Sequence, residues 1–229
     1  MNKKVLSRVL TAIFLAVVLI AAGVFFVSPA KQDNALAATD TWKTKYTSTS
    51  ETLETDADGY YIINSANDFA TFCYEKLANN NQFGRLYANI SLTLYNWEPV
   101  ILTQYSILDG NNYTISYLKI DGTVYSQAGL FSKIDYNAQV KNLRIANSTI
   151  TQPKQYAGFI AGYCEGVNTN YGSNIENCRV MASKISYEKF DGIESTLTLG
   201  GLVGFSYTSV IKNSESAVEI SVLDARNSE

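Results

Sequence analysis

Three six-residue stretches decide the fold: Val140-Lys141-Asn142-Leu143-Arg144-Ile145, Ile175-Glu176-Asn177-Cys178-Arg179-Val180 and Ile211-Lys212-Asn213-Ser214-Glu215-Ser216. A Gly-centred motif precedes each one: Ala128-Gly129-Leu130-Phe131-Ser132, Ala157-Gly158-Phe159-Ile160-Ala161 and Gly200-Gly201-Leu202-Val203-Gly204. The three stretches begin 35 and 36 residues apart, and the two motifs keep the same order each time. A repeat of this length predicts units that stack on one another and bury a common core.

The residue types of the repeat fit such stacking. A strand that pairs with its equivalents above and below needs apolar residues at its inward positions, which here are Val140, Ile175 and Ile211. A corner of the chain favours Asn, because Asn adopts left-handed backbone angles readily and stacked amides can bond along the axis. The expected corner residues are Asn142, Asn177 and Asn213. Glycine would let the backbone turn or approach closely at Gly129, Gly158 and Gly201.

The surrounding sequence is also β-like. Short alternating runs broken by Asn and Gly occur at 85–94, 113–120 and 140–145, and none is long enough for an uninterrupted helix. These features predict a mainly β fold built as a β-solenoid. An all-β sandwich with Gly-containing turns is the alternative.

The segment before the repeats predicts a linker and a helix. Residues 38–58 are rich in Thr and Ser without apolar periodicity, which is typical of a solvated linker. A strand is expected at 60–63. Ser65 then begins a capping-box-like start, and apolar residues recur at helical spacing, so 66–78 is expected to form an amphipathic helix that caps the repeats.

The amino terminus is typical of an export signal. Lys3, Lys4 and Arg8 precede an apolar run at 9–27, and Ala35-Leu36-Ala37 has the spacing of a signal peptidase site. An uncleaved membrane anchor is the alternative, because about 20 apolar residues are enough to span a bilayer. Both predict an extracellular location for the rest of the chain, secreted or at a bacterial cell surface.

Composition excludes several kinds of chemistry. The 229 residues contain no His, which removes His-based triads and the HExxH zinc site. The net charge is −3, and it is −6 after residue 37. An acidic chain without a Lys/Arg cluster makes nucleic acid an unsuitable partner. The three Cys residues are expected to be small buried residues, or Cys164 and Cys178 form a bridge and leave Cys73 over.

The Gly motifs and the strands that follow them resemble the GLUG repeats of bacterial surface and secreted proteins. The upstream segment resembles the usual lead-in to those repeats, at Trp97-Glu98-Pro99-Val100 and at 109–115, so the resemblance covers roughly 60–221. The final repeat departs from the pattern, because it has Ser214 and Ser216 at positions that are apolar in the two earlier repeats. The resemblance implies a right-handed parallel β-helix over 59–229 with an N-terminal capping helix.

The family also suggests roles. Its members are mostly surface or secreted proteins, some of them adhesins, and the repeats accompany immunoglobulin A metallopeptidase domains. That zinc chemistry does not carry over, because its motif needs two His residues.

Catalytic chemistry has weak support in the sequence. Candidate acids lie at expected turns or outward positions: Asp109, Asp121, Asp135, Glu165, Glu176, Asp191 and Glu194. A Ca²⁺ loop of Glu165, Asn168, Asn170 and Asn174 does not match EF-hand spacing, and such a loop needs no metal. No catalytic, cofactor or metal residue is therefore predicted.

Two irregular connections, 163–173 and 187–197, are the candidate ligand-binding segments, since solenoids tolerate insertions at corners. Their aromatic side chains are Tyr163, Tyr171, Tyr187 and Phe190. We expect a non-enzymatic, adhesin-like module that binds a host protein, a matrix protein or a glycan, or that acts as a spacer. A carbohydrate-active β-helix enzyme, or an accessory region of one, is the alternative. Residues 221–229 lack a capping helix, which predicts a frayed last coil or further domains missing at the C-terminus.

Overall fold

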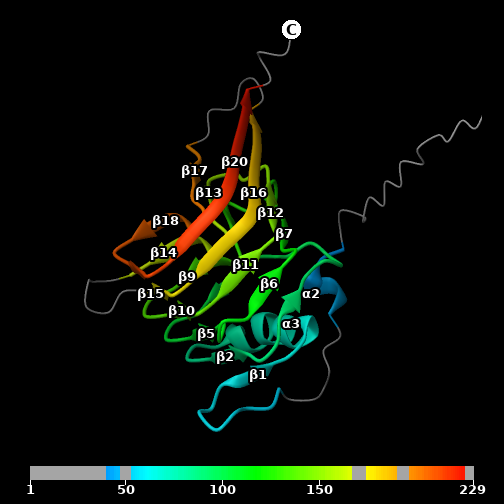
Figure 1. The fold of residues 1–229 in the computed structure, drawn as a ribbon, viewed down its shortest axis with the longest axis vertical. Helices are drawn as coiled ribbons and strands as arrows, with labels where there is room; N and C mark the ends of the chain where they lie inside the picture. The colour runs from blue at the N-terminus through cyan, green and yellow to red at the C-terminus, as the bar shows by residue number, and fades with distance from the viewer. Residues whose placement is uncertain (1–39, 47–52, 167–173, 190–195, 225–229) are drawn as a thin grey trace, which may run out of the picture. The chain divides into compact units, whose positions relative to one another are not determined.

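The computed structural model describes residues 40–46, 53–166, 174–189 and 196–224. These residues belong to one compact unit within 37–229. The expected export segment lies outside the described residues. The described chain is mainly β, with parallel strands in four sheets and few helices (Figure 1).

Short helices precede the repeats, and short strands form the four sheets. The helices are α2 (Trp42–Lys45), α3 (Ala66–Tyr74) and the 3-10 helix η1 (Lys76–Ala78). Sheet 1 contains β1 (Tyr61–Ile63), β2 (Phe83–Leu86), β5 (Ile107–Asp109), β10 (Gln139–Lys141), β15 (Asn174–Glu176) and β19 (Val210–Lys212). Sheet 2 contains β3 (Ile90–Ser91), β6 (Thr114–Ser116), β11 (Arg144–Ala146), β16 (Arg179–Lys189), β12 (Thr149–Thr151) and β7 (Lys119–Asp121), with β20 (Glu215–Asp224) also paired to β16. Sheet 3 contains β17 (Thr198–Leu199), β13 (Tyr156–Ala157) and β8 (Gln127–Ala128); sheet 4 contains β18 (Val203–Tyr207), β14 (Ala161–Glu165), β9 (Phe131–Ile134) and β4 (Val100–Leu102).

The chain visits the four sheets repeatedly in the same order. Strands β5 to β9 pass through sheets 1, 2, 3 and 4, strands β10 to β14 repeat the path, and strands β15 to β18 repeat it again. Strands β19 and β20 begin another passage. Each passage pairs in parallel with the one before it, so strands about 30 to 36 residues apart in the sequence lie side by side.

The three stretches that begin at 140, 175 and 211 lie in register. Val140 pairs with Ile175, and Ile175 pairs with Ile211. Val140 and Ile175 are fully buried, but Ile211 is 41% exposed, which corrects the expectation that it faces a closed core. The reason is its position in β19, the last strand of sheet 1.

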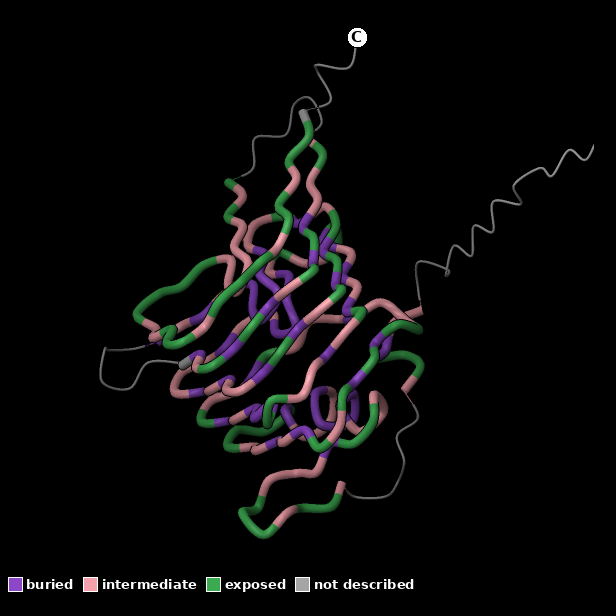
Figure 2. Tube along the Cα trace, in the orientation of Figure 1, coloured by how far each residue is buried: buried purple, intermediate pink, exposed green. Residues whose placement is uncertain are grey.

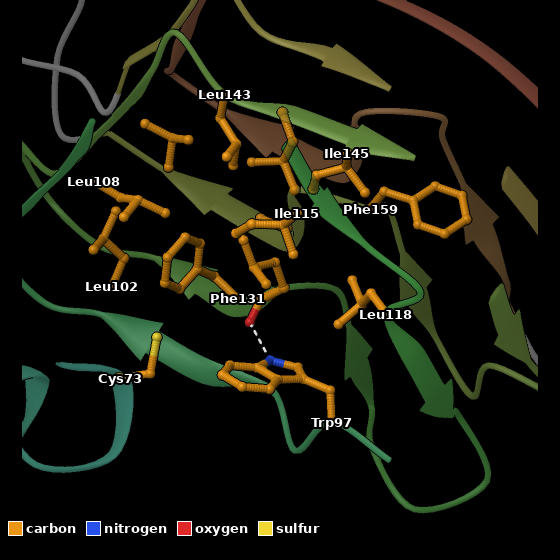
Figure 3. Close-up of a cluster of buried hydrophobic side chains, with 14 of the residues drawn as sticks. Cys73, Trp97, Leu102, Leu108, Ile115, Leu118, Phe131, Leu143, Ile145 and Phe159 are labelled. Atoms are coloured by element: carbon orange, nitrogen blue, oxygen red, sulfur yellow. Dashed lines mark hydrogen bonds between the residues drawn. The ribbon is translucent and has the colours of Figure 1, made fainter. Parts of the chain in front are cut away.

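The core lies between the sheets and is formed by the inward residue of each short strand. Figure 2 shows buried segments alternating with exposed ones along successive strands, as expected when side chains point to opposite faces. Figure 3 shows Ile115 beside Phe131, and Ile145 beside Phe159, in this core. The Trp97 indole N–H donates to the Leu130 carbonyl oxygen at 2.8 Å, so the largest core side chain is also satisfied as a donor.

Helix α3 covers the amino-terminal end of the core. Ser65 is its N-cap, because the Ser65 hydroxyl accepts a hydrogen bond from the Asp68 backbone N–H at 3.1 Å. Phe69 and Phe72 are fully buried against the first strands. The helix ends at Tyr74, earlier than the expected 78, because the chain continues as η1.

Part of the expected linker packs on the core. Trp42 in α2 is only 5% exposed, and its indole N–H donates to the Leu92 carbonyl oxygen at 3.3 Å. Thr41 also forms a parallel bridge with Asn96. Residues 40–46 are therefore part of the packed unit, because one large apolar side chain supplies enough burial to hold a short segment in place.

Candidate ligand-binding face

Aromatic side chains and charges meet on the outer face of sheet 4. Register places Lys133, Tyr163 and Phe205 in one column across β9, β14 and β18. The next residues along β9 and β14, Ile134 and Cys164, point inward and are fully buried. Alternation along each strand therefore directs the column outward.

The aromatic rings of this face contact one another. Tyr163 and Phe205 stack with ring centroids 5.5 Å apart and an interplanar angle of 12°. Tyr156 of sheet 3 contacts both rings, at 5.9 Å from Tyr163 and 5.1 Å from Phe205. Burial, reinforced by the nearby Glu165 carboxylate, raises the pKa of Tyr163. Tyr163 is therefore partly covered by its neighbours, whereas Phe205 is 37% exposed and Tyr207 is 56% exposed.

A lysine links two carboxylates beside these rings. The Lys133 ammonium contacts the Asp135 carboxylate at 3.3 Å and also pairs with Glu165. Burial alone would lower the pKa of Lys133, but hydrogen bonds and charge attraction from the two acids outweigh it and raise that pKa. Glu165 is in register with Tyr207 on the neighbouring strand. The face thus joins exposed aromatic surface to fixed polar groups, an arrangement suited to binding.

Two of the four predicted aromatic ligand residues lie within strands. Tyr163 is in β14 and Tyr187 is in β16, which corrects the expectation that both belong to irregular connections. Tyr171 and Phe190 lie outside the described residues. Sequence reasoning missed Phe205 and Tyr207. The available signal for Phe205 was its position directly after Gly201-Leu202-Val203-Gly204, which matches Lys133 and Tyr163 in the earlier repeats, and Tyr207 is two residues further along the same strand.

Sheet 1 carries a separate column of charges on its outer face. Strand register gives Arg85, Asp109, Lys141, Glu176 and Lys212 in order, so the sign of the charge alternates. The Asp109 carboxylate lies 3.5 Å from the Arg85 guanidinium and 3.7 Å from the Lys141 ammonium. Opposite charges on adjacent strands stabilise this register, so Asp109 has a structural role.

The Asn residues of the repeat stand at corners, as their backbone angles show. Asn142, Asn177 and Asn213 have φ values of 53°, 54° and 47°. The Asn177 side-chain amide donates to the Asn142 side-chain oxygen at 3.2 Å, and Asn142 donates to Asp109 at 3.0 Å. These bonds run from one passage to the next and hold the corner.

The glycines of the repeat are sites of close backbone approach. A Cβ atom on Gly129 would lie 2.5 Å from the Gly158 carbonyl oxygen, and one on Gly158 would lie 2.6 Å from the Gly204 backbone nitrogen. Neither distance admits a side chain, so both positions require Gly irrespective of turn geometry. Gly201 is also crowded, but by the Ser216 and Val218 side chains.

The cysteines provide no nucleophile on the outer face of sheet 4. Cys73 and Cys178 are buried free thiols, so no bridge joins Cys178 to the buried Cys164. Burial raises the pKa of Cys178 to about 11 and that of Cys73 well above its usual value. A neutral buried thiol is inert, because the reactive form is the thiolate.

The described residues contain no group of three or more His, Cys, Asp or Glu side chains that could hold a metal ion. Within the same ranges, no helix is both long and apolar enough to cross a bilayer. Of the suggested Ca²⁺ loop, Asn168 and Asn170 lie outside the described ranges, and Glu165 pairs with Lys133.

Comparison with known proteins gives a likeness of fold. No family model matches the sequence, and no curated protein matches it. A solved structure that matches is a crystal structure of a protein from Bacteroides ovatus, named "putative immunoglobulin A1 protease". The two chains are 15% identical with a TM-score of 0.50, and the match covers 72% of this chain and 63% of that chain. This chain therefore spans less than two thirds of that protein, and the likeness concerns the fold alone.

Proposed function

We propose that the protein is a non-enzymatic extracellular module, and that the outer face of sheet 4 binds a glycan. The observation that carries this proposal is the exposure of Phe205 and Tyr207 beside the Lys133–Glu165 pair. Aromatic side chains pack against the apolar faces of sugar rings, while charged groups exchange hydrogen bonds with sugar hydroxyls. Both kinds of group are present on this face: Lys133 and Phe205 lie in one column across sheet 4, and Glu165 and Tyr207 lie in the next.

The scaffold in this proposal is a right-handed parallel β-helix of the GLUG-repeat kind. The recurring path through four sheets, the Asn corners and the fold likeness to the Bacteroides protein support it. Strand β18 pairs with β14 along four residues, so the side chains of the face are attached to a paired backbone. A preorganised face binds better than a mobile loop, because less conformational entropy is lost.

The export signal predicted for residues 1–37 supports an extracellular location. The exposed aromatic face favours binding over a spacer role, since a spacer needs no such surface.

An enzyme acting on polysaccharides is the second candidate. It is favoured by the closeness of Asp135 and Glu165, which both contact the Lys133 ammonium. Glycoside hydrolysis requires one of two carboxyl groups to carry a proton. Both carboxylates are engaged by the same ammonium, so the pair suits binding better than acid–base chemistry. Release of reducing ends from a polysaccharide panel by the full chain, abolished by Glu165→Gln, would favour the enzyme.

A glycan array with the full chain tests the proposed binding. We expect Phe205→Ala and Tyr207→Ala each to weaken the affinity for a captured glycan roughly tenfold, because each removes one aromatic contact. Tyr117→Ala is the control, since Tyr117 is 46% exposed between β6 and β7 of sheet 2. Absence of binding to any glycan, or equal binding by all three variants, would contradict the proposal.

A further inference from the structure

An exposed tyrosine, Tyr105, stands in a column whose other members are Asn. Asn81, Tyr105 and Asn137 each lie two residues before a strand of sheet 1, namely β2, β5 and β10. The Asn81 backbone N–H donates to the Gln104 carbonyl oxygen at 2.8 Å, and the Tyr105 backbone N–H donates to the Tyr136 carbonyl oxygen at 3.3 Å. These equivalent bonds align the three residues at the corner that leads into sheet 1.

All three residues of this column have left-handed backbone angles, which suit Asn better than Tyr. The φ value is 60° at Asn81, 60° at Tyr105 and 58° at Asn137. Asn adopts this region readily, whereas a bulky side chain there is strained. Tyr105 gains little burial in return, because it is 50% exposed. Strained residues of this kind cluster at ligand-binding sites.

The Tyr105 ring belongs to an aromatic pair. It packs edge-on against the Tyr136 ring, with centroids 5.9 Å apart and an interplanar angle of 69°. Asn81 and Asn137 flank Tyr105 in the column, and their side-chain amides can both donate and accept hydrogen bonds. The corner thus offers apolar ring surface beside groups that bond to hydroxyls, which is the chemistry that a sugar needs.

This corner adjoins the outer face of sheet 4. Asp135 directly precedes Tyr136, and its carboxylate accepts a hydrogen bond from the Tyr136 backbone N–H at 2.8 Å. The same carboxylate contacts the Lys133 ammonium at 3.3 Å. Lys133 is in the column of Tyr163. A continuous set of contacts therefore leads from the aromatic rings of sheet 4 to the Tyr105–Tyr136 pair.

The two aromatic groups are too far apart for one sugar ring to contact both. Tyr163 lies in β14 and Tyr105 follows β4, and β9 lies between these strands in sheet 4. Two strand spacings alone separate the Cα atoms by about 10 Å. A glycan that contacts both groups must therefore be a chain of several sugar units.

We infer that the Tyr105–Tyr136 pair is a second aromatic subsite, and that the ligand is a linear polysaccharide bound through several consecutive units. This inference rests on the glycan binding proposed for the outer face of sheet 4. The two subsites bind different units of one chain, so the second adds affinity only for a ligand long enough to reach both. Between them, Asp135 and Glu165 outnumber Lys133, which favours an uncharged chain over an acidic one.

Isothermal titration calorimetry of the full chain tests the second subsite. The probes are uncharged cello-, manno- and chito-oligosaccharides of two and of six units. Tyr105→Asn is expected to weaken the binding of a hexasaccharide about tenfold, because one aromatic contact is lost. The same variant should bind the disaccharide as the wild type does, since a disaccharide on sheet 4 does not reach the corner.

Tyr117→Asn is the matched control. Tyr117 is 46% exposed with a φ of 58°, and its backbone N–H donates to the Ala146 carbonyl oxygen, which makes Asn147 its neighbour at a corner of sheet 2. Each change therefore introduces the residue that the next passage already has at that corner. Neither should lower the melting temperature measured by circular dichroism, because Asn relieves the backbone strain. Tyr117→Asn should also bind both lengths of oligosaccharide as the wild type does.

The outcomes separate this inference from the proposed function. Unchanged hexasaccharide binding by Tyr105→Asn, or an equal loss for the disaccharide, would overturn the second subsite while glycan binding by sheet 4 stands. A Tyr105→Asn variant that melts well below the wild type would also overturn it, because Tyr105 would then serve stability. A wild type that binds none of the oligosaccharides would overturn the proposed function and this inference together.

Discussion

Replacing Ile175 by Asp tests the stacked column most severely. Ile175 is fully buried and lies between Val140 and Ile211 in register. The change removes about 1.5 to 3 kcal/mol of apolar burial. It also buries a carboxylate without a partner, which adds several kcal/mol. The total is comparable with the whole stability of an ordinary domain, about 5 to 15 kcal/mol.

The same column offers a matched control. Ile211 is the next residue along it but is 41% exposed, so Ile211→Asp leaves the carboxylate in contact with water. We expect Ile211→Asp to cost about 1 to 2 kcal/mol, and Ile175→Ala to cost about 2 to 5 kcal/mol.

The free energy of unfolding of Ile175→Asp, Ile175→Ala and Ile211→Asp is measured by urea unfolding at a low protein concentration, followed by far-ultraviolet circular dichroism. Ile175→Asp is expected to lack the cooperative transition, and Ile211→Asp to keep it. A wild-type-like transition for Ile175→Asp, or equal losses of stability from Asp at the two positions, would refute the claim that Ile175 is buried between Val140 and Ile211.

Three further outcomes are expected. Trp42→Ala should cost about 3 to 5 kcal/mol in urea unfolding, because Trp42 is 5% exposed in the core, whereas a solvated linker residue would give no change. Cys178 should contribute about 2 to 3 kcal/mol to the fall in the free energy of unfolding between pH 9 and 11, since its folded pKa is about 11 and its ordinary value is 9.0. The buried Cys73 adds to the same fall, so Cys178→Ala should reduce the fall by about 2 to 3 kcal/mol without abolishing it. Desolvation alone would raise the pKa of Asp56, but hydrogen bonds from Tyr60 and Tyr87 and the charge of Arg85 outweigh it and lower that pKa, so the melting temperature should decline as pH falls below about 4. An Asp56→Asn variant that declines as steeply as the wild type would show that another group is responsible.

The repeat made much of the fold predictable. Period and residue type specified which positions lie side by side, and the left-handed φ of Asn142 and the inward burial of Val140 follow from local chemistry. The N-cap of α3 was also predictable from the sequence, because Ser65 lies three residues before Asp68, whose backbone N–H donates to the Ser65 hydroxyl.

Features that depend on distant contacts were not predictable. The Thr/Ser-rich composition around Trp42 gives no sign that Leu92 accepts its indole N–H, since that contact joins residues 50 positions apart. The stacking of Tyr163 on Phe205 likewise depends on the pairing of β14 with β18, which became visible only once register was known. The sequence therefore predicts candidate binding residues in the connections, whereas the structure exposes aromatic surface on the strands.

Register between adjacent passages is tested most directly with an engineered disulfide. Lys141 and Glu176 are Cα partners in sheet 1. Paired Cα atoms there lie about 4.8 Å apart, within the range for a disulfide. We predict that Lys141→Cys/Glu176→Cys forms a bridge on mild oxidation, detected by non-reducing peptide mass spectrometry. The shifted pair Lys141→Cys/Asn174→Cys, about 8 Å apart, should not. A bridge in the shifted pair, or none in the paired one, would contradict the stacked arrangement on which the fold and both proposals depend.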